Sequence, residues 1–364
     1  MQSPISFFSG LRDPRVERTK AHSLVDILFI AIASVICGAE TWNDMELFGK
    51  SKECWLRTVL RLPEGIPSHD TFNRVFSLLD PKELEEGFLQ WIRSVAQLTE
   101  GEVVSIDGKS IRGSRGRDGK NIVHMVSAWA GENNLVLGQV KVDDKSNEIT
   151  AIPELLKLLV LKGCIVTIDA IGCQKGIAEE IAGKEADYIL ALKSNQGHLL
   201  QQAEDSFRLL DVKSISEETD AGHGRVETRV CSVVDDLVLV RQREEWKNLR
   251  SLVRIESERY MKATGESEKE IRYYISSLPA DASLLNRSIR SHWGIENSLH
   301  WVLDVAFNED HSRKRAGYAA QNFSVINRIA LNLLKNDRAT KHGVKGKRLK
   351  AGWDEKYLMD ILNI

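Results

Sequence analysis

Two short segments of the chain are near copies of each other, and each ends on an aspartate. They read VSID, ending at Asp107, and VTID, ending at Asp169. Apolar and small polar residues alternate in both segments, which predicts two strands whose polar side chains share one face. If the strands are parallel neighbours, their carboxylates meet at the carboxyl edge of a sheet, where open α/β sheets bind ligands.

A third carboxylate, Glu296, falls within the apolar stripe of a helix predicted over residues 284–303. Burying that charge is costly unless something compensates it, and a metal ion shared with Asp107 and Asp169 would do so. Neighbouring carboxylates repel unless a cation lies between them, and oxygen ligands without Cys or His favour Mg²⁺, with Mn²⁺ as a substitute. The three acids are therefore the predicted metal ligands and catalytic residues.

Other interpretations of these residues stay open. An aspartate at the end of a strand is commonly a turn or capping residue, and Glu296 would also suit a partly exposed helix face. Asp304 and Asp310 compete with Glu296 for the third position. His292 and His300 flank Glu296 at four-residue spacing and would allow a transition-metal site, although this spacing differs from the HExxH motif of zinc hydrolases.

Basic and amide residues follow the predicted acids and also occur in a later segment. Such residues are usually solvated loop charge, but beside a predicted metal site they favour contacts with phosphate. The predicted phosphate-binding residues are Lys109, Arg112, Arg115, Lys193, Asn195, Gln196, Arg225 and Arg229, and Arg117 and Lys120 belong to the first basic run.

The segments that carry the acids predict an α/β fold with a mixed sheet. Three β-rich runs predict a meander, and the later alternation of helices and strands predicts parallel strands with helices on both faces. In chain order these are strands 102–107, 122–130 and 135–142, helix 148–162, strand 164–169, helix 174–183 and strand 187–192. The predicted order is βββαβαβ, followed by the helix that carries Glu296.

Three further regions complete the predicted organisation. Residues 1–95 have helical spacing and predict a small helical domain, either a DNA-binding module or an ordinary bundle. Residues 196–283 predict a β-rich insertion into a core made of 96–195 and 284–335, and residues 336–364 predict a basic C-terminal tail. The strands predicted within the insertion are 226–234, 238–241, 252–261 and 271–278.

The composition is that of a soluble globular protein. The 364 residues carry 50 Lys and Arg against 52 Asp and Glu, so any nucleic-acid surface requires local segregation of charge. Five scattered cysteines without a CxxC pair argue against a disulfide framework and a structural zinc site, and they favour a cytoplasmic location. No secretory signal or membrane span is expected, because the longest apolar run is shorter than the roughly 20 residues that a span needs.

The chain resembles the DDE transposases of bacterial insertion sequences, and most closely the H-repeat-associated proteins linked to Rhs elements. The matching stretches occur in order along nearly the whole chain. They are FSGLRDPR (8–15), EGIPSHDTFNRV (64–75), SIDGKSIRG (105–113), TIDAIGCQ (167–174), ALKSNQ (191–196), HGRVETR (223–229) and HWGIENSLHWVLDVAFNED (292–310). The resemblance implies a ribonuclease-H-like core in which Asp107, Asp169 and Glu296 are the catalytic acids.

One signature of the wider group is not met. That signature is Tyr-x2-Arg-x3-Glu-x6-Lys, and this chain has Ile289, His292 and Leu303 at the Tyr, Arg and Lys positions. The roles of those three residue types therefore do not transfer to this chain. His292 stands where the arginine would be, and we expect it to contact phosphate in a pH-dependent way. The resemblance implies that the phosphate is that of DNA, so the predicted DNA-binding residues are the basic and amide residues given above together with His292 and His300.

The resemblance implies DNA transposition as the function. Two Mg²⁺ ions about 3.5–4 Å apart would activate a water and stabilise the leaving 3′ oxygen, after which the freed 3′-OH attacks target DNA. Double-stranded DNA is the implied partner, and a homodimer on DNA is expected because two element ends must be joined. The alternatives are a transposase-derived DNA-binding protein, a metal-dependent nuclease and a metal-dependent phosphohydrolase of small substrates. The intact acids argue against the first and the basic clusters argue against the last.

Overall fold

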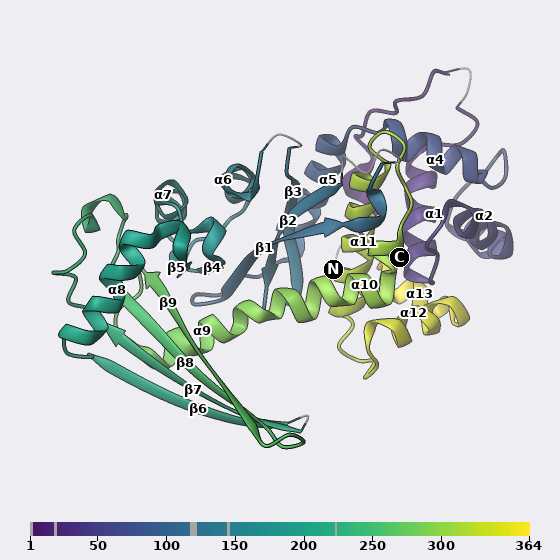
Figure 1. The fold of residues 1–364 in the computed structure, drawn as a ribbon. Coiled ribbons are helices and arrows are strands. Elements are labelled where there is room, and N and C mark those ends of the chain that lie inside the picture. Colours follow the sequence, from purple (N-terminus) through teal and green to yellow (C-terminus); the bar gives the residue numbers. More distant parts are fainter. Residues whose placement is uncertain (1–2, 18–19, 117–121, 144–145, 223) are drawn as a thin grey trace.

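The computed structural model describes residues 3–17, 20–116, 122–143, 146–222 and 224–364. Arg117 and Lys120 of the predicted basic run, and His223 of one matching motif, lie outside the described residues. Figure 1 shows a twisted sheet with most helices gathered at one end of the molecule and a ribbon of long strands at the other. None of the described helices has both the length and the apolar character needed to cross a membrane.

Among the described residues, nine strands form one mixed sheet in the spatial order β3-β2-β1-β4-β5-β9-β8-β7-β6. The strands are β1 (Val103–Ile111), β2 (Val123–Ala130), β3 (Leu135–Lys141), β4 (Ile165–Ile168), β5 (Asp187–Leu192), β6 (Ser214–Gly222), β7 (Arg225–Val234), β8 (Ser251–Met261) and β9 (Glu266–Ser276).

Strands β1 to β5 and their helices follow the predicted βββαβαβ order, which confirms the α/β, ribonuclease-H-like fold class. β1 pairs antiparallel with β2 and parallel with β4, and β4 pairs parallel with β5. The crossover helices α6 (Glu148–Leu158) and α7 (Lys175–Gly183) contact each other on one face of the sheet (Figure 1). Each buries an apolar stripe there, which is the usual way a parallel sheet is covered.

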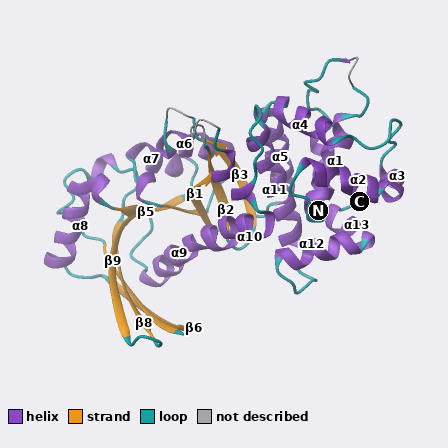
Figure 2. Ribbon diagram, turned by 45° about the vertical axis from the view of Figure 1, so that its right-hand side comes forward, coloured by secondary structure: helices purple, strands orange, loops and turns teal. Residues whose placement is uncertain are grey.

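The predicted β-rich insertion continues the same sheet. β9 pairs antiparallel with β5, and β8, β7 and β6 follow as antiparallel neighbours. Helix α8 (Gly197–Leu209) links β5 to this part of the chain. Figure 2 shows the strands of the insertion curving away from the core. We call β6 to β9 the sheet extension, because an unbroken hydrogen-bonded ladder joins them to the core.

Two details of the insertion differ from the prediction. Residues 238–241, predicted as a strand, lie in a turn region, because the Asp236 carboxylate accepts a hydrogen bond from the Val238 backbone N–H and closes a local turn. β6 was not among the predicted strands. Its sequence, SISEETDAG, is largely polar and its side chains are mostly exposed, so it lacks the apolar alternation that marks a half-buried strand.

A helical segment crosses the opposite face of the sheet and connects the extension with the core (Figure 1). Helix α9 (Ala282–Ile295) begins after Asp281, whose carboxylate caps it by accepting the Leu284 backbone N–H. It contacts β6 and β7 in the extension and β1 and β4 in the core. A π-helical turn (Glu296–His300) then leads into α10 (Trp301–Phe307). The predicted helix is confirmed, and its wide turn begins at the third predicted acid.

The N-terminal region is helical, as predicted. Its helices are α1 (Leu24–Ile36), α2 (Trp42–Ser51), α3 (Glu53–Val59), α4 (His69–Leu78) and α5 (Pro81–Val95). α1 is buried on nearly every side because α2 and α11 (Ala319–Asn336) pack against it, and α11 also contacts α4, α5 and β3. A helix from the C-terminal part of the chain thus completes the packing between the helical region and the core.

The predicted basic tail, residues 336–364, is folded. It forms α12 (Val344–Trp353) and α13 (Glu355–Leu362), which pack against α1 and α11. The buried Arg348 guanidinium donates hydrogen bonds to the backbone carbonyls of Val35 and Ala306. The basic character of this segment is therefore partly structural, because a cation satisfies carbonyls at the ends of two other helices.

Candidate active site

Asp107 and Asp169 occupy equivalent positions on neighbouring parallel strands. The β1–β4 register pairs Ile106 with Ile168, so the next residue of each strand is an aspartate. β4 ends there, and the Asp169 carboxylate accepts the Ile171 backbone N–H at 3.1 Å, which caps a short 3₁₀ turn. Asp169 thus follows the last residue of β4, as predicted. Asp107 lies within β1, just past its parallel pairing with β4, because β1 continues to Ile111 and does not end at the aspartate as predicted.

Asp107, Asp169 and Glu296 line one cavity of about 580 Å³. The two aspartates are half-buried, whereas Glu296 is exposed at the start of the π-helical turn. Among the residues that the structure describes, no three His, Cys, Asp or Glu side chains are close enough together to hold one ion. The three acids share a cavity, and they do not form a preassembled ligand cluster.

The electrostatics of the cavity disfavour the accumulated negative charge. The pKa of Asp107 is raised to about 7, mainly by burial and further by the charges of Asp169, Glu148 and Glu296, while the Gly108 backbone N–H opposes the shift. Burial also raises the pKa of Asp169, and the Glu148 charge adds to that shift. Carboxylate oxygens that repel one another in a partly buried cavity suit a hard divalent cation, so the residues present fit Mg²⁺ or Mn²⁺.

The side chains of the two histidines that flank Glu296, His292 and His300, contact β4 and β1 next to the aspartates. His292 Nδ1 is 2.9 Å from Thr167 Oγ1, and His300 Nδ1 is 3.5 Å from Asp107 Oδ2. Burial lowers the pKa of His292 to about 4 and that of His300 to about 3. Both imidazoles are thus neutral at neutral pH. The predicted DNA contacts of both residues, pH-dependent for His292, stay predictions. In the structure both rings lie against the sheet, next to Thr167 and Asp107.

Lys109 was predicted to bind DNA, but its ammonium group is paired inside the protein. It is 8% exposed, and its Nζ lies 2.8 Å from Asp304 Oδ1 and 3.1 Å from Asp310 Oδ1. These two acids were the competitors of Glu296 for the third position, and neither lines the cavity of the other three. The carboxylates of Asp304 and Asp310 therefore compensate a buried lysine.

The other basic residues of the core that were predicted to bind DNA are exposed. Arg112 and Arg115 lie after β1, and Arg112 Nε is 3.3 Å from Asp310 Oδ2. Lys193 follows β5 and lines the acid cavity, where its charge partly offsets the raised pKa of Asp169. These three side chains are accessible to a phosphate.

Asn195 and Gln196 hold the loop that follows Asp169. Asn195 Nδ2 donates to the Ala170 carbonyl at 2.6 Å, and Gln196 Nε2 donates to the Cys173 carbonyl at 2.9 Å. Both amide groups therefore have backbone partners on either side of the 3₁₀ turn. In the structure both side chains support this loop, and their predicted DNA contacts stay a prediction.

Arg225 and Arg229 both lie on β7, on the same face of the sheet extension. Arg225 is exposed near the end of the β6–β7 hairpin, and Arg229 is buried. Together with residues of α9 they line a second cavity, which also reaches Glu296. The structure thus brings the two predicted arginines toward the third acid from a distant part of the sequence.

A fourth acid, Glu148, lies beside the site and was not predicted. Its Oε1 is 2.6 Å from His124 Nε2, and the other ring nitrogen of His124 is 2.8 Å from Ser110 Oγ. The same carboxylate lies so close to the backbone of Gly108 that no Cβ would fit there. Glu148 is the first residue of α6. From the sequence alone, this position indicates only a favourable interaction with the helix dipole and not a place beside the acids.

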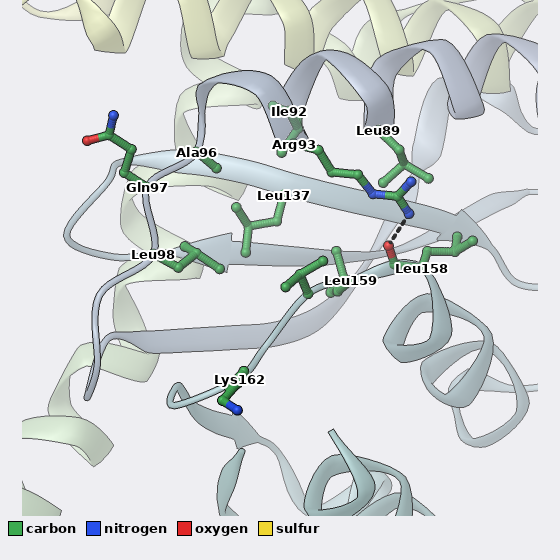
Figure 3. Close-up of a pocket in the computed structure, with 11 residues that line it drawn as sticks. Leu89, Ile92, Arg93, Ala96, Gln97, Leu98, Leu137, Leu158, Leu159 and Lys162 are labelled. Carbon is green, nitrogen blue, oxygen red and sulfur yellow. Dashed lines mark hydrogen bonds between the residues drawn. The ribbon is translucent and has the colours of Figure 1, made fainter. Parts of the chain in front are cut away.

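A separate cavity of about 420 Å³ lies between α5, β3 and the segment after α6 (Figure 3). Leucine side chains such as Leu89, Leu137 and Leu159 line it, and Arg93 Nη2 donates to the Leu158 carbonyl at its rim. It holds none of the predicted acids. The cavity with the three carboxylates is therefore the candidate active site.

Two protein families match this chain. The family described as "DDE_Tnp_1-associated" matches residues 5–92, and the family described as "Transposase DDE domain" matches residues 98–333. The second match includes all three acids of the cavity, the helical segment α9 to α10 and the whole sheet extension.

Curated relatives match over nearly the full length. "Putative transposase YncI" of Escherichia coli O157:H7 is 45% identical over 370 residues, covering 100% of this chain and 95% of the relative. "H repeat-associated putative transposase YhhI" of Escherichia coli strain K12 is 42% identical over 351 residues, covering 94% and 92%. A piggyBac transposase synaptic complex with hairpin DNA aligns with 98% of this chain and 76% of that chain, at a TM-score of 0.45 and 12% identity.

Proposed function

The chain belongs to the DDE transposase family, and on that basis we propose that it cuts the ends of a DNA element and joins them to target DNA. The proposed catalytic residues and metal ligands are Asp107, Asp169 and Glu296, with Mg²⁺ as the metal and Mn²⁺ as a substitute. The observation that carries this proposal is the cavity that acids from three distant segments of the chain line together.

The acids have distinct places in the proposed reaction. Asp107 and Asp169 present oxygen ligands from two hydrogen-bonded strands, and Glu296 approaches from the helical segment on the other side of the cavity. A divalent ion bound by them would supply an activated water and neutralise the charge on the leaving 3′ oxygen. Thr167 and His292 hold the helix beside Asp169 through their hydrogen bond of 2.9 Å. Lys193 is placed to bind a substrate phosphate at the cavity wall.

Double-stranded DNA is the proposed partner, both as element end and as target. Lys193 at the acid cavity and Arg225 and Arg229 on β7 support this. A chain with a net charge of −2 must gather its phosphate contacts locally. We expect two copies of the chain to assemble on DNA, since transposition joins two ends.

The test is cleavage of a labelled duplex that carries the element end, with the full chain and Mg²⁺, Mn²⁺ or EDTA. We expect cleavage with either metal and none in EDTA. Asp107→Asn, Asp169→Asn and Glu296→Gln should each lose about a thousandfold or more in rate, because the metal site supplies several kcal/mol of transition-state stabilisation. Asp310→Asn is the matched control for the third acid, and loss of cleavage there with Glu296→Gln still active would disprove the assignment.

Two other outcomes would replace the proposal. Salt-sensitive DNA binding without cleavage under any divalent ion would show a DNA-binding protein that no longer moves DNA. Hydrolysis of small phosphate esters without cleavage of DNA would show a phosphohydrolase. Both measurements use the same preparation of protein.

A further inference from the structure

A second cavity adjoins the acid cavity and lies against the sheet extension. Its volume is about 470 Å³, and its floor is one face of β7, β8 and β9, with the end of α9 as its wall. The two cavities share Glu270, Arg272, Tyr274, Trp293 and Glu296. We call it the arginine cavity, because five arginines line it: Arg225, Arg229, Arg259, Arg272 and Arg290.

Positive charge exceeds negative charge in the arginine cavity. Glu227, Glu270 and Glu296 are the acids among its lining residues. Arg272 is paired with Glu270 at 2.7 Å, and Arg259 approaches Glu227 at 3.9 Å. Arg290 is paired with Asp220, an acid outside the lining, at 2.7 Å. Arg225 and Arg229 are therefore the lining arginines that have no ion pair in the described part of the chain.

The guanidinium group of Arg229 is buried without a complete set of hydrogen-bond acceptors. Arg229 is 6% exposed, and its Nε is buried without a hydrogen-bond partner. In the described part of the chain no acid lies within ion-pair distance of it. Tyr274, Glu227 and Glu218 favour its charge from farther away, and Arg290 opposes it as a like charge. Burial lowers the pKa of Arg229. A buried guanidinium without a full set of acceptors is costly, and a bound anion would remove that cost.

Phosphodiester groups suit this cavity better than other anions of the same charge. The arginine fork binds two phosphate oxygens at once, and several arginines on a pleated surface can follow successive phosphates along a strand. The cavity leads from Glu296 along the sheet extension, so a strand bound there would continue directly from the acid cavity.

We propose that the arginine cavity binds the phosphate backbone of the DNA next to the cleavage site, and that the sheet extension thereby holds the substrate in register with the acids. This inference rests on the proposed function. β9 is hydrogen-bonded to β5, and α9 carries Arg290 one turn and a half before Glu296. The arginine cavity and the acid cavity are therefore parts of one rigid frame.

The test is fluorescence anisotropy with a labelled duplex of arbitrary sequence, in EDTA and over a range of salt concentrations. EDTA separates binding from cleavage. Arg229→Gln should weaken binding and reduce the slope of log Kd against log salt by about 1, because one phosphate contact is lost. Arg225→Gln, at an exposed position of the same cavity, should do the same without any risk to folding. Arg243→Gln is the matched control, an exposed arginine 3.1 Å from Glu244 and outside both cavities.

The inference is overturned if Arg229→Gln and Arg225→Gln both keep the wild-type Kd and salt slope while their thermal unfolding is unchanged. If the wild-type chain binds no duplex at any salt concentration, the proposed function itself fails. A methylphosphonate scan of the duplex gives an independent readout. A neutral linkage at the contacted phosphate should weaken the wild type but not Arg229→Gln, and equal weakening of both proteins would also count against the inference.

Discussion

Lys109 ties the strand that carries Asp107 to the segment that follows Glu296. It lies two residues after Asp107 on β1, so both side chains point to the same face, and its ammonium group pairs with Asp304 and Asp310. Lys109→Met should lower the free energy of unfolding by about 2–4 kcal/mol, because two partly buried carboxylates lose their cation. Urea unfolding measures this change.

The pairing itself is checked by a double-mutant cycle. Adding Asp304→Asn or Asp310→Asn to Lys109→Met should recover part of the lost stability, because each removes one unpaired charge. Strictly additive losses would show that the ion pairs do not hold these segments together. Arg112→Met, at an exposed position near Asp310, is the matched control and should change the unfolding free energy little.

Glu85 on α5 makes stability depend on pH at a site far from the acids. It is 8% exposed, its Oε1 has no hydrogen-bond partner, and burial raises its pKa to about 8. The folded protein therefore holds a proton that the unfolded chain releases above its ordinary pKa of 4.5. Stability should fall with rising pH between these two values, by up to about 1.4 kcal/mol per unit, and level off above about 8.

Glu85→Gln should remove this dependence. The variant keeps the shape of the protonated acid, so its free energy of unfolding should exceed that of the wild type at alkaline pH and match it near pH 5. Urea unfolding at several pH values compares the two proteins. The same slope in both would assign the pH dependence to other groups.

At the scale of elements, the loop between β4 and α7 determines where Asp169 points. Asn195→Ala removes the hydrogen bond to the Ala170 carbonyl, next to Asp169. We expect cleavage to slow by roughly tenfold to a hundredfold, because a small displacement of a catalytic group is costly. Duplex binding in EDTA should stay unchanged, since the amide is already used by the protein.

If Asn195 contacts DNA, as the sequence predicted, its substitution should have the opposite effects on duplex binding and on cleavage. If Asn195 binds phosphate, Asn195→Ala weakens binding in EDTA, and cleavage at saturating DNA remains close to normal. Gln201→Ala on α8 is a matched control, because Gln201 is an exposed amide outside the acid cavity. The two measurements together separate a loop support from a substrate contact.

The helices and strands of the core were predictable because the pattern of apolar and polar residues in each one matches which of its side chains are buried. β1 and β4 alternate apolar and small polar residues up to their aspartates, and this pattern also predicted that the strands are parallel neighbours. The partner of β5 was not predictable. Its pairing with β9 joins strands separated by the whole insertion, and backbone hydrogen bonds between distant segments leave no mark in the local pattern.

The sequence predicted that Asp107, Asp169 and Glu296 lie near one another, and they line one cavity. It did not predict the contacts of the residues around them. The three carboxylates have spacing and surroundings that indicate metal chemistry. The burial of Lys109, His292 and His300 depends on how α9 and α10 press against the sheet, and the sequence shows only their residue types. The π-helical turn at Glu296 was not predictable either. The residues before and after it have ordinary helical spacing, so the sequence pattern does not indicate a wider turn at that point.

At the scale of the whole molecule, the two ends of the chain build one helical body. The second family match ends at residue 333, yet α12 and α13 continue beyond it and pack on α1 and α11. Leu358, Ile361 and Leu362 are buried there, and Arg348 holds backbone carbonyls of α1 and α10. A flexible basic tail would be dispensable for folding, whereas this packing makes the segment part of the core.

Removal of residues 337–364 should therefore unfold the protein or leave it insoluble. Each buried Leu or Ile contributes about 1.5–3 kcal/mol, so the loss approaches the whole stability of a typical protein, about 5–15 kcal/mol. Ile361→Ala is a milder form of the same test and should cost about 2–4 kcal/mol in urea unfolding. Trp353→Ala is its control, because Trp353 is 78% exposed and should change the unfolding free energy by less than about 0.5 kcal/mol. A truncated chain that unfolds at the wild-type urea concentration would contradict the packing of α12 and α13.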